Sequence, residues 1–127
     1  MAGLTFDTGA LINLERRRLD MRKLVEVALE DQVPVTVPAV VVAEWWRTGR
    51  HTRERETILR MFVVEPLTEY VAKLAGEALT RVPRAGTIDA IVMASASLRG
   101  DIVYTSDLGD LARLQERVFR SVRIEQA

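Results

Sequence analysis

Short apolar runs alternate with longer amphipathic stretches along this 127-residue chain, and this alternation limits the possible folds more than any other feature. Runs rich in β-branched or aromatic residues predict five β-strands, at residues 4–6, 34–38, 62–67, 102–105 and 122–124. Apolar residues at helical spacing predict helices between them, at residues 10–14, 20–30, 39–48, 52–60, 69–81, 87–99 and 107–117. Because strands that alternate with helices form a parallel sheet covered on both faces, we predict a single three-layer α/β/α domain over residues 1–127.

Composition and charge exclude several classes of protein. The 18 basic and 18 acidic residues cancel, which argues against a protein that coats nucleic acid by bulk electrostatic attraction. The chain has no cysteine and a single histidine, His51, which excludes disulfides, thiolate zinc sites and a histidine-rich metal site within one chain. No apolar run is long enough to span a bilayer, and Met1 to Gly3 lead into a strand rather than a signal peptide. We therefore expect a cytoplasmic protein with no membrane partner.

One acid lies on the apolar face of a predicted helix. At helical spacing, Asp89 shares that face with Val92, Met93 and Ala96. An unpaired ionised carboxylate facing the core is costly, so Asp89 must be protonated, find a partner or bind a cation. The alternative is an acid that caps its own helix N-terminus, where the helix dipole favours negative charge.

Three further acids occupy comparable positions. Asp7 and Asp107 each follow a predicted strand, and Glu44 lies where an apolar helical stripe meets a polar one. In parallel sheets, ligands bind beyond the carboxyl ends of the strands, where the strand order reverses. An ordinary structural role is open to each acid: Asp7 and Asp107 fit helix N-caps, and Glu44 can pair with Arg47.

If these four acids meet in space, their mutual repulsion requires a cation. Two carboxylates 4 Å apart repel by roughly 4 kcal/mol at an effective dielectric constant near 20. A ligand set made only of carboxylate oxygens selects Mg²⁺, with Mn²⁺ as a substitute, rather than Zn²⁺. We therefore expect the carboxylates of Asp7, Asp89 and Asp107 to lie close enough to share an ion, which could activate water for phosphodiester hydrolysis.

The order and setting of these acids resemble those of PIN-domain ribonucleases. The matching segments are Asp7 to Leu11, Glu44 on an early helix, Asp89-Ala90 on a late helix, and Thr105 to Asp107. The compact length and the Val-Ala-Glu-Trp segment at residues 42–45 look most like VapC-type toxins of bacterial toxin–antitoxin pairs. The resemblance implies a parallel sheet of order 3-2-1-4-5, a homodimer, Mg²⁺-dependent endonucleolytic cleavage of RNA with 5′-phosphate and 3′-hydroxyl products, and inhibition by a cognate antitoxin protein.

The same resemblance implies roles for individual residues. Asp7 and Asp89 are the expected principal metal ligands, and Asp107 and Glu44 would hold the ion through water or position the attacking water. Asp110 matches an accessory acid of some members. Gly9 stands where the family often has Ser or Asn, so a supporting polar side chain near Asp7 is missing. The hydroxyls of Thr8 and Thr105 could replace it.

Arginines and tryptophans supply candidate contacts to partners. Arginines in connections or at helix ends are candidate RNA contacts, or else a solvated surface: Arg16, Arg17, Arg18, Arg47, Arg50, Arg53 and Arg84. Trp45 and Trp46 diverge by about 100° on a helix, so we predict that one packs in the core. The other is a candidate part of an exposed groove for an antitoxin segment.

Three other functions remain open or can be set aside. A phosphoacceptor receiver domain needs an acidic pair after the first strand, an acceptor Asp after the third and a late lysine. Here Thr8 follows Asp7, the third strand ends at Glu65-Pro66, and no lysine follows Lys73. A PIN-like module that binds RNA or protein without cutting is a second alternative, against which the presence of all four acids argues. A phosphatase that forms an aspartyl-phosphate needs an acid at position 9, where this chain has glycine.

Overall fold

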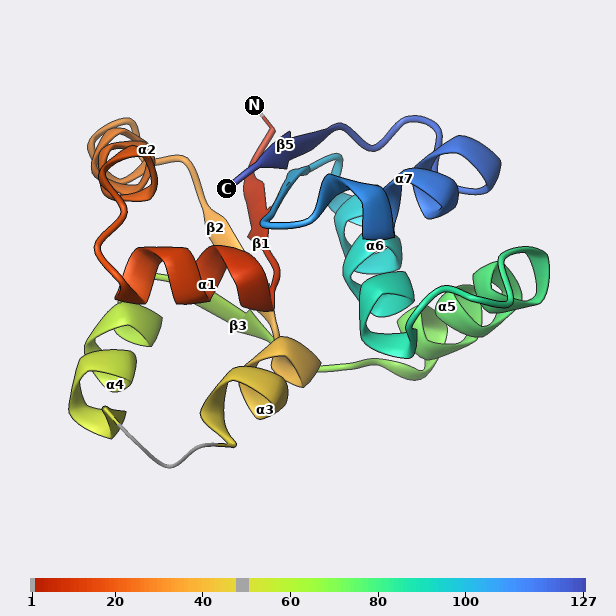
Figure 1. Ribbon diagram of the computed structural model, residues 1–127, viewed down its shortest axis with the longest axis horizontal. Coiled ribbons are helices and arrows are strands. Elements are labelled where there is room, and N and C mark those ends of the chain that lie inside the picture. The colour runs from red at the N-terminus through yellow and green to blue at the C-terminus, as the bar shows by residue number, and fades with distance from the viewer. Residues whose placement is uncertain (1, 48–50) are drawn as a thin grey trace.

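The computed structural model describes residues 2–47 and 51–127 (Figure 1). The strands in this described part are β1 (Leu4–Phe6), β2 (Val35–Pro38), β3 (Val63–Glu65), β4 (Ile102–Thr105) and β5 (Ile124–Gln126). The helices are α1 (Thr8–Glu15), α2 (Leu19–Glu30), α3 (Ala39–Trp46), α4 (Thr52–Arg60), α5 (Glu69–Arg81), α6 (Thr87–Arg99) and α7 (Leu108–Arg117).

The strands form one parallel sheet in the order β3-β2-β1-β4-β5. In its central pair, Phe6 of β1 is in register with Tyr104 of β4, so both strands end at the same edge of the sheet. This order confirms the predicted 3-2-1-4-5 arrangement. It differs from the 2-1-3-4-5 order of receiver-like sheets, and the receiver alternative is therefore wrong for this chain.

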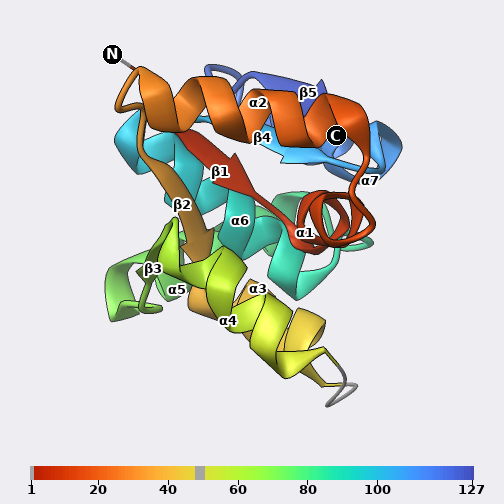
Figure 2. The same ribbon diagram turned by 90° about the vertical axis from the view of Figure 1, so that its left-hand side faces the viewer.

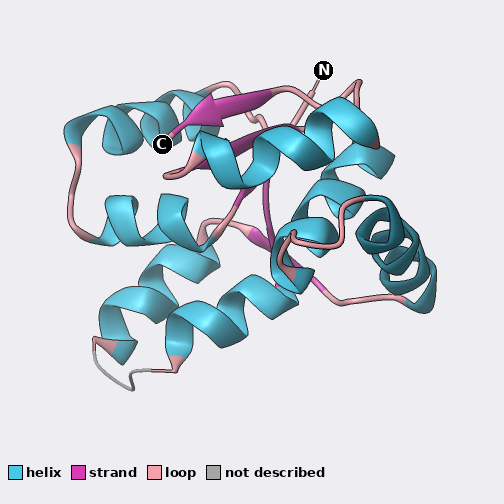
Figure 3. Cartoon of the chain, turned by 45° about the vertical axis from the view of Figure 1, so that its right-hand side comes forward, coloured by secondary structure: helices cyan, strands magenta, loops and turns pink. Residues whose placement is uncertain are grey.

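Helices cover both faces of the sheet, which confirms the three-layer prediction. Figure 1 shows α1, α2 and α4 on one side of the strands and α5 and α6 on the other. In Figure 2, which looks from the side of α2, the strands lie between α2 and α6. Figure 3 shows helices around the inner strands, whereas the edge strand β5, next to the C-terminus, runs along the top of the view. None of the helices in the described part combines the length and apolar character that crossing a membrane requires.

The helix α6 is the central helix of the second layer, and its burial explains its composition. Its residues from Ala90 to Ala96 are all buried, and α6 contacts β1, β2, β4 and the helices α3, α5 and α7. Because other helices and strands pack around the whole circumference of α6, apolar residues are favoured on all of its faces. Because α6 is followed by β4 and runs back along the sheet, its N-terminus lies at the edge where the strands end. This arrangement brings Asp89 to the same edge as Asp7 and Asp107.

The last strand begins later than predicted. We expected residues 122–124, whereas β5 spans Ile124–Gln126. The N–H of Val122 donates to Phe119 O at 3.1 Å, so the backbone at Val122 closes a turn and cannot join the sheet. Pairing with β4 starts only where Val103 N–H donates to Arg123 O at 2.9 Å. The predicted end of the third helix, at Thr48 and Gly49, falls outside the described residues.

Candidate active site

Asp7 joins the end of β1 to the start of α1. Its N–H donates to Tyr104 O at 3.2 Å, which continues the pairing with β4, and its side chain is buried. Oδ1 of Asp7 accepts from the N–H of Ala10 at 2.9 Å, so the carboxylate caps α1. Burial and capping together hold this acid in one orientation.

Asp107 has the corresponding position after β4. Its Oδ1 accepts from the N–H groups of Gly109 at 3.1 Å and Asp110 at 3.4 Å, so it caps α7. The Asp107 N–H donates to Thr105 Oγ1 at 3.1 Å, which ties the capping residue to the buried end of the strand. The ordinary N-cap roles of Asp7 and Asp107 are therefore both observed. They do not exclude a second role.

Glu44 and Asp89 reach the same region from two other helices. The hydroxyl of Thr8 donates to Oε1 of exposed Glu44, which links α1 to α3. Within the described residues, Glu44 and Arg47 form no ion pair. Asp89 is half-buried in the first turn of α6, with Oδ2 only 3.4 Å from the point that a Cβ at Gly86 would occupy.

All five predicted acids line one cavity of about 240 Å³. The acids are Asp7, Glu44, Asp89, Asp107 and Asp110, and the remaining lining residues are Thr8, Gly9, Ile88, Thr105 and Ser106. The tertiary structure thus brings together acids from the starts of α1, α6 and α7 and from the middle of α3. A larger cavity of about 390 Å³ lies among α1, α2 and α4, but glutamates and arginines occur together in its lining and their charges offset.

The cavity makes ionisation of its central acid unfavourable. Loss of hydration raises the pKa of Asp89 to about 6, and the carboxylates of Asp110, Asp7, Glu44 and Asp107 add to the effect. Burial also raises the pKa of Asp7 above its ordinary value, against opposing hydrogen bonds from Thr105 and from the backbone N–H groups of Ala10 and Gly9. Perturbed pKa values of this kind gather at functional sites, where neighbouring charges are held closer than folding requires.

The donor set suits a hard divalent cation, but the acids are not arranged as a closed cage. The described part of the chain contains no group of three or more Asp, Glu or His side chains already positioned to hold a metal ion. One oxygen of Asp7 and one of Asp107 accept hydrogen bonds from backbone N–H groups, and Glu44 accepts one from Thr8, so the protein itself holds these three acids. Metal ligation by these residues therefore stays a prediction.

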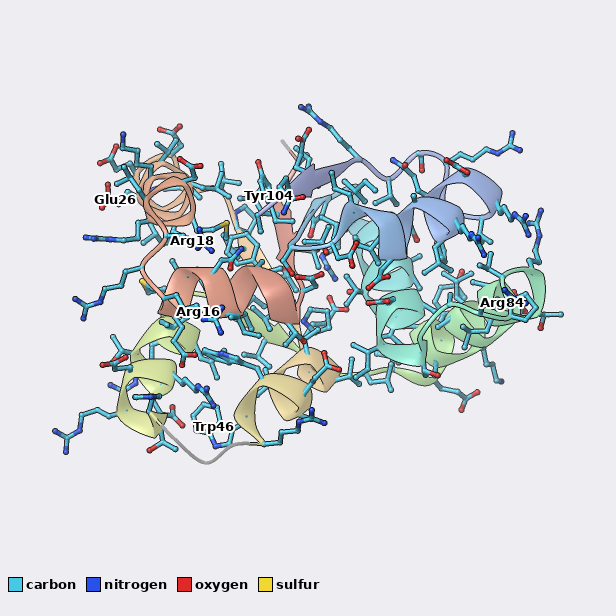
Figure 4. All side chains as sticks on the ribbon, viewed as in Figure 1. Arg16, Arg18, Glu26, Trp46, Arg84 and Tyr104 are labelled. Carbon is cyan, nitrogen blue, oxygen red and sulfur yellow. The ribbon has the colours of Figure 1, made fainter. Side chains whose placement is uncertain are left out.

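The other predicted site residues lie apart from the cavity or outside the description. Arg16, Arg47 and Arg84 are all exposed, whereas Arg50 is outside the described residues. In Figure 4, Arg16 lies beside α1 and Arg84 lies at the opposite end of the molecule, beyond α5. These arginines consequently do not form one continuous patch. Of the supporting hydroxyls, Thr8 contacts Glu44, and Thr105 contacts Asp7 and Asp107.

The tryptophan pair behaves as helical spacing predicts. Trp45 is 3% exposed and packs against the guanidinium of Arg55, which lies 5.1 Å from the ring centroid. Trp46 is half-buried and forms an edge-to-face contact with Trp45, at 6.1 Å between centroids. It lines a surface cavity with side chains of α4 (Figure 4). Its role in binding an antitoxin stays a prediction.

The sequence analysis assigned no role to two residues of the cavity lining, Ile88 and Ser106, of which Ser106 is polar. A Cβ built on Gly9 would lie 1.9 Å from Oγ of Ser106, so this hydroxyl occupies the space in which a side chain at position 9 would lie. Two signals were present in the sequence: a serine directly before Asp107, and a glycine two residues after Asp7. Nothing in the sequence placed the two side by side.

The raised pKa of Asp89 predicts a pH-dependent stabilisation by Asp89→Asn in the absence of divalent cations. An unfolded Asp titrates near 3.8 and folded Asp89 near 6, so the folded state binds the proton more tightly and stability falls as pH rises from about 4 to 6. In Asp89→Asn the amide does not titrate, so this fall in stability with rising pH does not occur. Allowing for solvent screening at a half-buried site, the variant should be more stable by about 1 kcal/mol at pH 7.5 and equal to the parent chain below pH 4. Urea unfolding in EDTA at both pH values measures this, and an equal difference at both would contradict it.

Comparisons with known proteins agree with this geometry. A sequence model of the PIN domain matches residues 4–116. No curated protein matches the chain.

Among solved structures, DNA-bound VapBC from Salmonella typhimurium is similar with a TM-score of 0.80 at 17% identity, over 99% of this chain and 98% of that one. VapBC2 from Rickettsia felis, bound to a promoter DNA fragment, has a TM-score of 0.78 at 12% identity, over 98% of both chains. A toxin–antitoxin complex from Klebsiella pneumoniae has a TM-score of 0.70 at 22% identity, over 87% and 91%. At these identities the structural matches establish the fold alone.

Proposed function

The chain belongs to the PIN domain family, and from this premise we propose that it is a Mg²⁺-dependent endoribonuclease, the toxin of a type II toxin–antitoxin pair of the VapC kind. The observation that carries the proposal is the single cavity lined by Asp7, Glu44, Asp89, Asp107 and Asp110. A fold needs no such cluster for its own stability, because gathered carboxylates repel each other.

The residues of the cavity fit a Mg²⁺ or Mn²⁺ ion. Asp7 and Asp89 would be the principal ligands, Asp107 and Glu44 would hold the ion through water, and Asp110 would act from further out. Such ions take oxygen ligands, and the described cavity lining contains carboxylates and hydroxyls but no sulfur or imidazole. When bound, the cation would offset the negative charge of the acids and of the RNA phosphate, and would increase the acidity of a water molecule.

The chain's own side chains would orient the reaction. Asp7 is held by the N–H of Ala10, so its second oxygen can face the cavity without a change in the helix cap. Glu44, oriented by Thr8, and Asp107, oriented by the start of α7, would position the attacking water. Addition of that water to phosphorus, with cleavage of the bond to the 3′ oxygen, would leave a 5′-phosphate and a 3′-hydroxyl.

Partners follow from the same proposal. The similar structures are toxin–antitoxin complexes, and two of them are bound to DNA. For this chain we propose an antitoxin protein as inhibitor, a homodimeric assembly, and RNA as substrate. Arg16, Arg47 and Arg84 are candidate phosphate contacts because all three are exposed. Trp46 is a candidate antitoxin contact because its exposed part adjoins arginines of α4.

The function is tested with purified protein and 5′-labelled RNA. We expect endonucleolytic cleavage in Mg²⁺ or Mn²⁺, loss of cleavage in EDTA, and its recovery when Mn²⁺ is added in excess of the chelator. Sequencing the RNA ends should find 5′-phosphates. Mn²⁺ binding without cleavage of any RNA would overturn the nuclease proposal. If the protein neither binds Mn²⁺ nor cleaves RNA, the result would favour a PIN-like module that binds RNA or protein without cutting.

A further inference from the structure

Gly9 and Ser106, which both line the acid-lined cavity, compete for one space. A Cβ at position 9 would lie 1.9 Å from Ser106 Oγ, 2.7 Å from Ser106 Cβ and 3.1 Å from Ser106 N. Rotation of the serine side chain could move Oγ away, but it moves neither Cβ nor the backbone nitrogen. Only one of the two positions can therefore carry a side chain while the turn after β4 keeps its place over α1.

This close approach joins the two segments that carry the capping acids. Gly9 lies two residues after Asp7, and Ser106 immediately precedes Asp107. The strand ends that carry them are paired through Asp7 N–H and Tyr104 O. The serine carbonyl is held from outside by the side-chain amide of Gln126, at 3.1 Å. The turn is thus fixed on one side by β5 and rests on Gly9 on the other.

Ser106 is an exposed residue at the cavity, and its hydroxyl lies against Gly9 with its hydrogen-bonding capacity available. Ser106 lines the cavity, and in the part of the chain that the structure describes its hydroxyl makes no hydrogen bond to protein. Its neighbours in the lining are mostly acids, which accept hydrogen bonds and cannot donate them when ionised. A hydroxyl there can donate to a carboxylate oxygen or to an ordered water and so restrict the orientation of either.

We propose that Ser106 is a positioning residue of the metal site, whose hydroxyl occupies, from the turn after β4, the space that a side chain at Gly9 would fill from α1. The proposal rests on the proposed function for the presence of the metal. The hydroxyl acts on the site whichever of the two elements carries it.

The test moves the hydroxyl from one element to the other. In Ser106→Gly the hydroxyl is lost and the space above Gly9 opens. The double variant Gly9→Ser with Ser106→Gly puts a hydroxyl back from α1. Its matched control, Gly9→Ala with Ser106→Gly, fills the same space with a methyl group. Both double variants have the same added backbone freedom at position 106, so they differ only in the hydroxyl.

The readouts are Mn²⁺ affinity by calorimetry and thermal unfolding in EDTA. We expect Ser106→Gly to weaken Mn²⁺ binding about tenfold or more, a typical effect of losing a group that orients metal ligands. The Gly9→Ser double variant should recover affinity to within about threefold of the parent chain, whereas the Gly9→Ala double variant should unfold at the same temperature but stay weak. Gly9→Ser alone should lower the unfolding temperature, because both side chains then compete for one space.

Each outcome is decisive. The role of Ser106 is overturned if Ser106→Gly binds Mn²⁺ as tightly as the parent chain. It is also overturned if the alanine and serine double variants recover Mn²⁺ affinity equally, or if the parent chain binds no Mn²⁺. If the parent chain binds Mn²⁺ and the transferred hydroxyl restores affinity, but no RNA is cleaved, the role of Ser106 stands and the nuclease proposal fails.

Discussion

Replacing Asp7 or Asp89 by asparagine should reduce metal-dependent RNA cleavage by about a thousandfold or more, the largest effect we expect from any single substitution. The estimate corresponds to the several kcal/mol of transition-state stabilisation that a correctly held metal ion supplies. The substitution is conservative in shape. Asparagine caps a helix about as well as aspartate, so the side-chain amide oxygen in Asp7→Asn could still accept from Ala10 N–H.

The charge-matched control is Asp31→Asn. Asp31 is exposed at the end of α2, where removal of one negative charge changes the net charge equally but touches no cavity residue. We expect Asp31→Asn to cleave RNA like the parent chain in single-turnover assays. If Asp7→Asn and Asp89→Asn retain more than a tenth of parent activity while folded, the assignment of these acids is wrong. Thermal unfolding separates this result from misfolding.

Replacing Arg99 by alanine should lower the free energy of unfolding by about 3–5 kcal/mol, a large effect for a polar residue. Arg99, the last residue of α6, connects this helix to three strands or strand ends. Its Nε lies 2.8 Å from Asp101 Oδ2, its Nη2 donates to Thr5 Oγ1 at 2.9 Å, and its Nη1 pairs with Glu65. Thr5 in turn donates to Asp101 at 2.8 Å.

The expected loss of unfolding free energy in Arg99→Ala follows from the burial of its partner rather than from the number of ion pairs. The side chain of Asp101 is 4% exposed, so without Arg99 its charge would remain in the interior with the Thr5 hydroxyl as a donor but without the opposite charge of the guanidinium. The control is Lys73→Ala. Lys73 pairs with Glu69 at 2.6 Å, but both side chains are more than two thirds exposed, and the loss should be below about 0.5 kcal/mol. Urea unfolding measures both, and similar losses in the two variants would show that the buried network is dispensable.

The network around Arg99 also explains how the site edge is held. It anchors the C-terminus of α6 to β1, β3 and the start of β4, while the N-terminus of the same helix carries Asp89 at the opposite edge. Because α6 is one continuous helix, fixing the position of its C-terminus also fixes the position of its N-terminus. A partial loss of fold in Arg99→Ala should therefore weaken Mn²⁺ binding as well, although Arg99 lies outside the cavity lining.

Local sequence patterns were sufficient for most of the fold. The strand–helix alternation, the all-round apolar character of α6 and the capping positions of Asp7 and Asp107 depend on residues within a few positions of one another, and each was predicted correctly. The shifted start of β5 is an exception, because local composition does not predict the turn from Phe119 to Val122. The strand order came from the family resemblance rather than from any local pattern.

The sequence by itself determined which elements form and which acids end strands or open helices, because periodicity, capping and strand propensity act over short stretches of chain. Only the tertiary structure decided that five acids share one cavity, that burial and the neighbouring carboxylates raise the pKa of Asp89, and that Ser106 occupies the space above Gly9. These facts depend on distances between segments that are remote along the chain. Such distances are set by how helices pack across a sheet, and side-chain packing at that scale leaves no periodic signal in a single sequence.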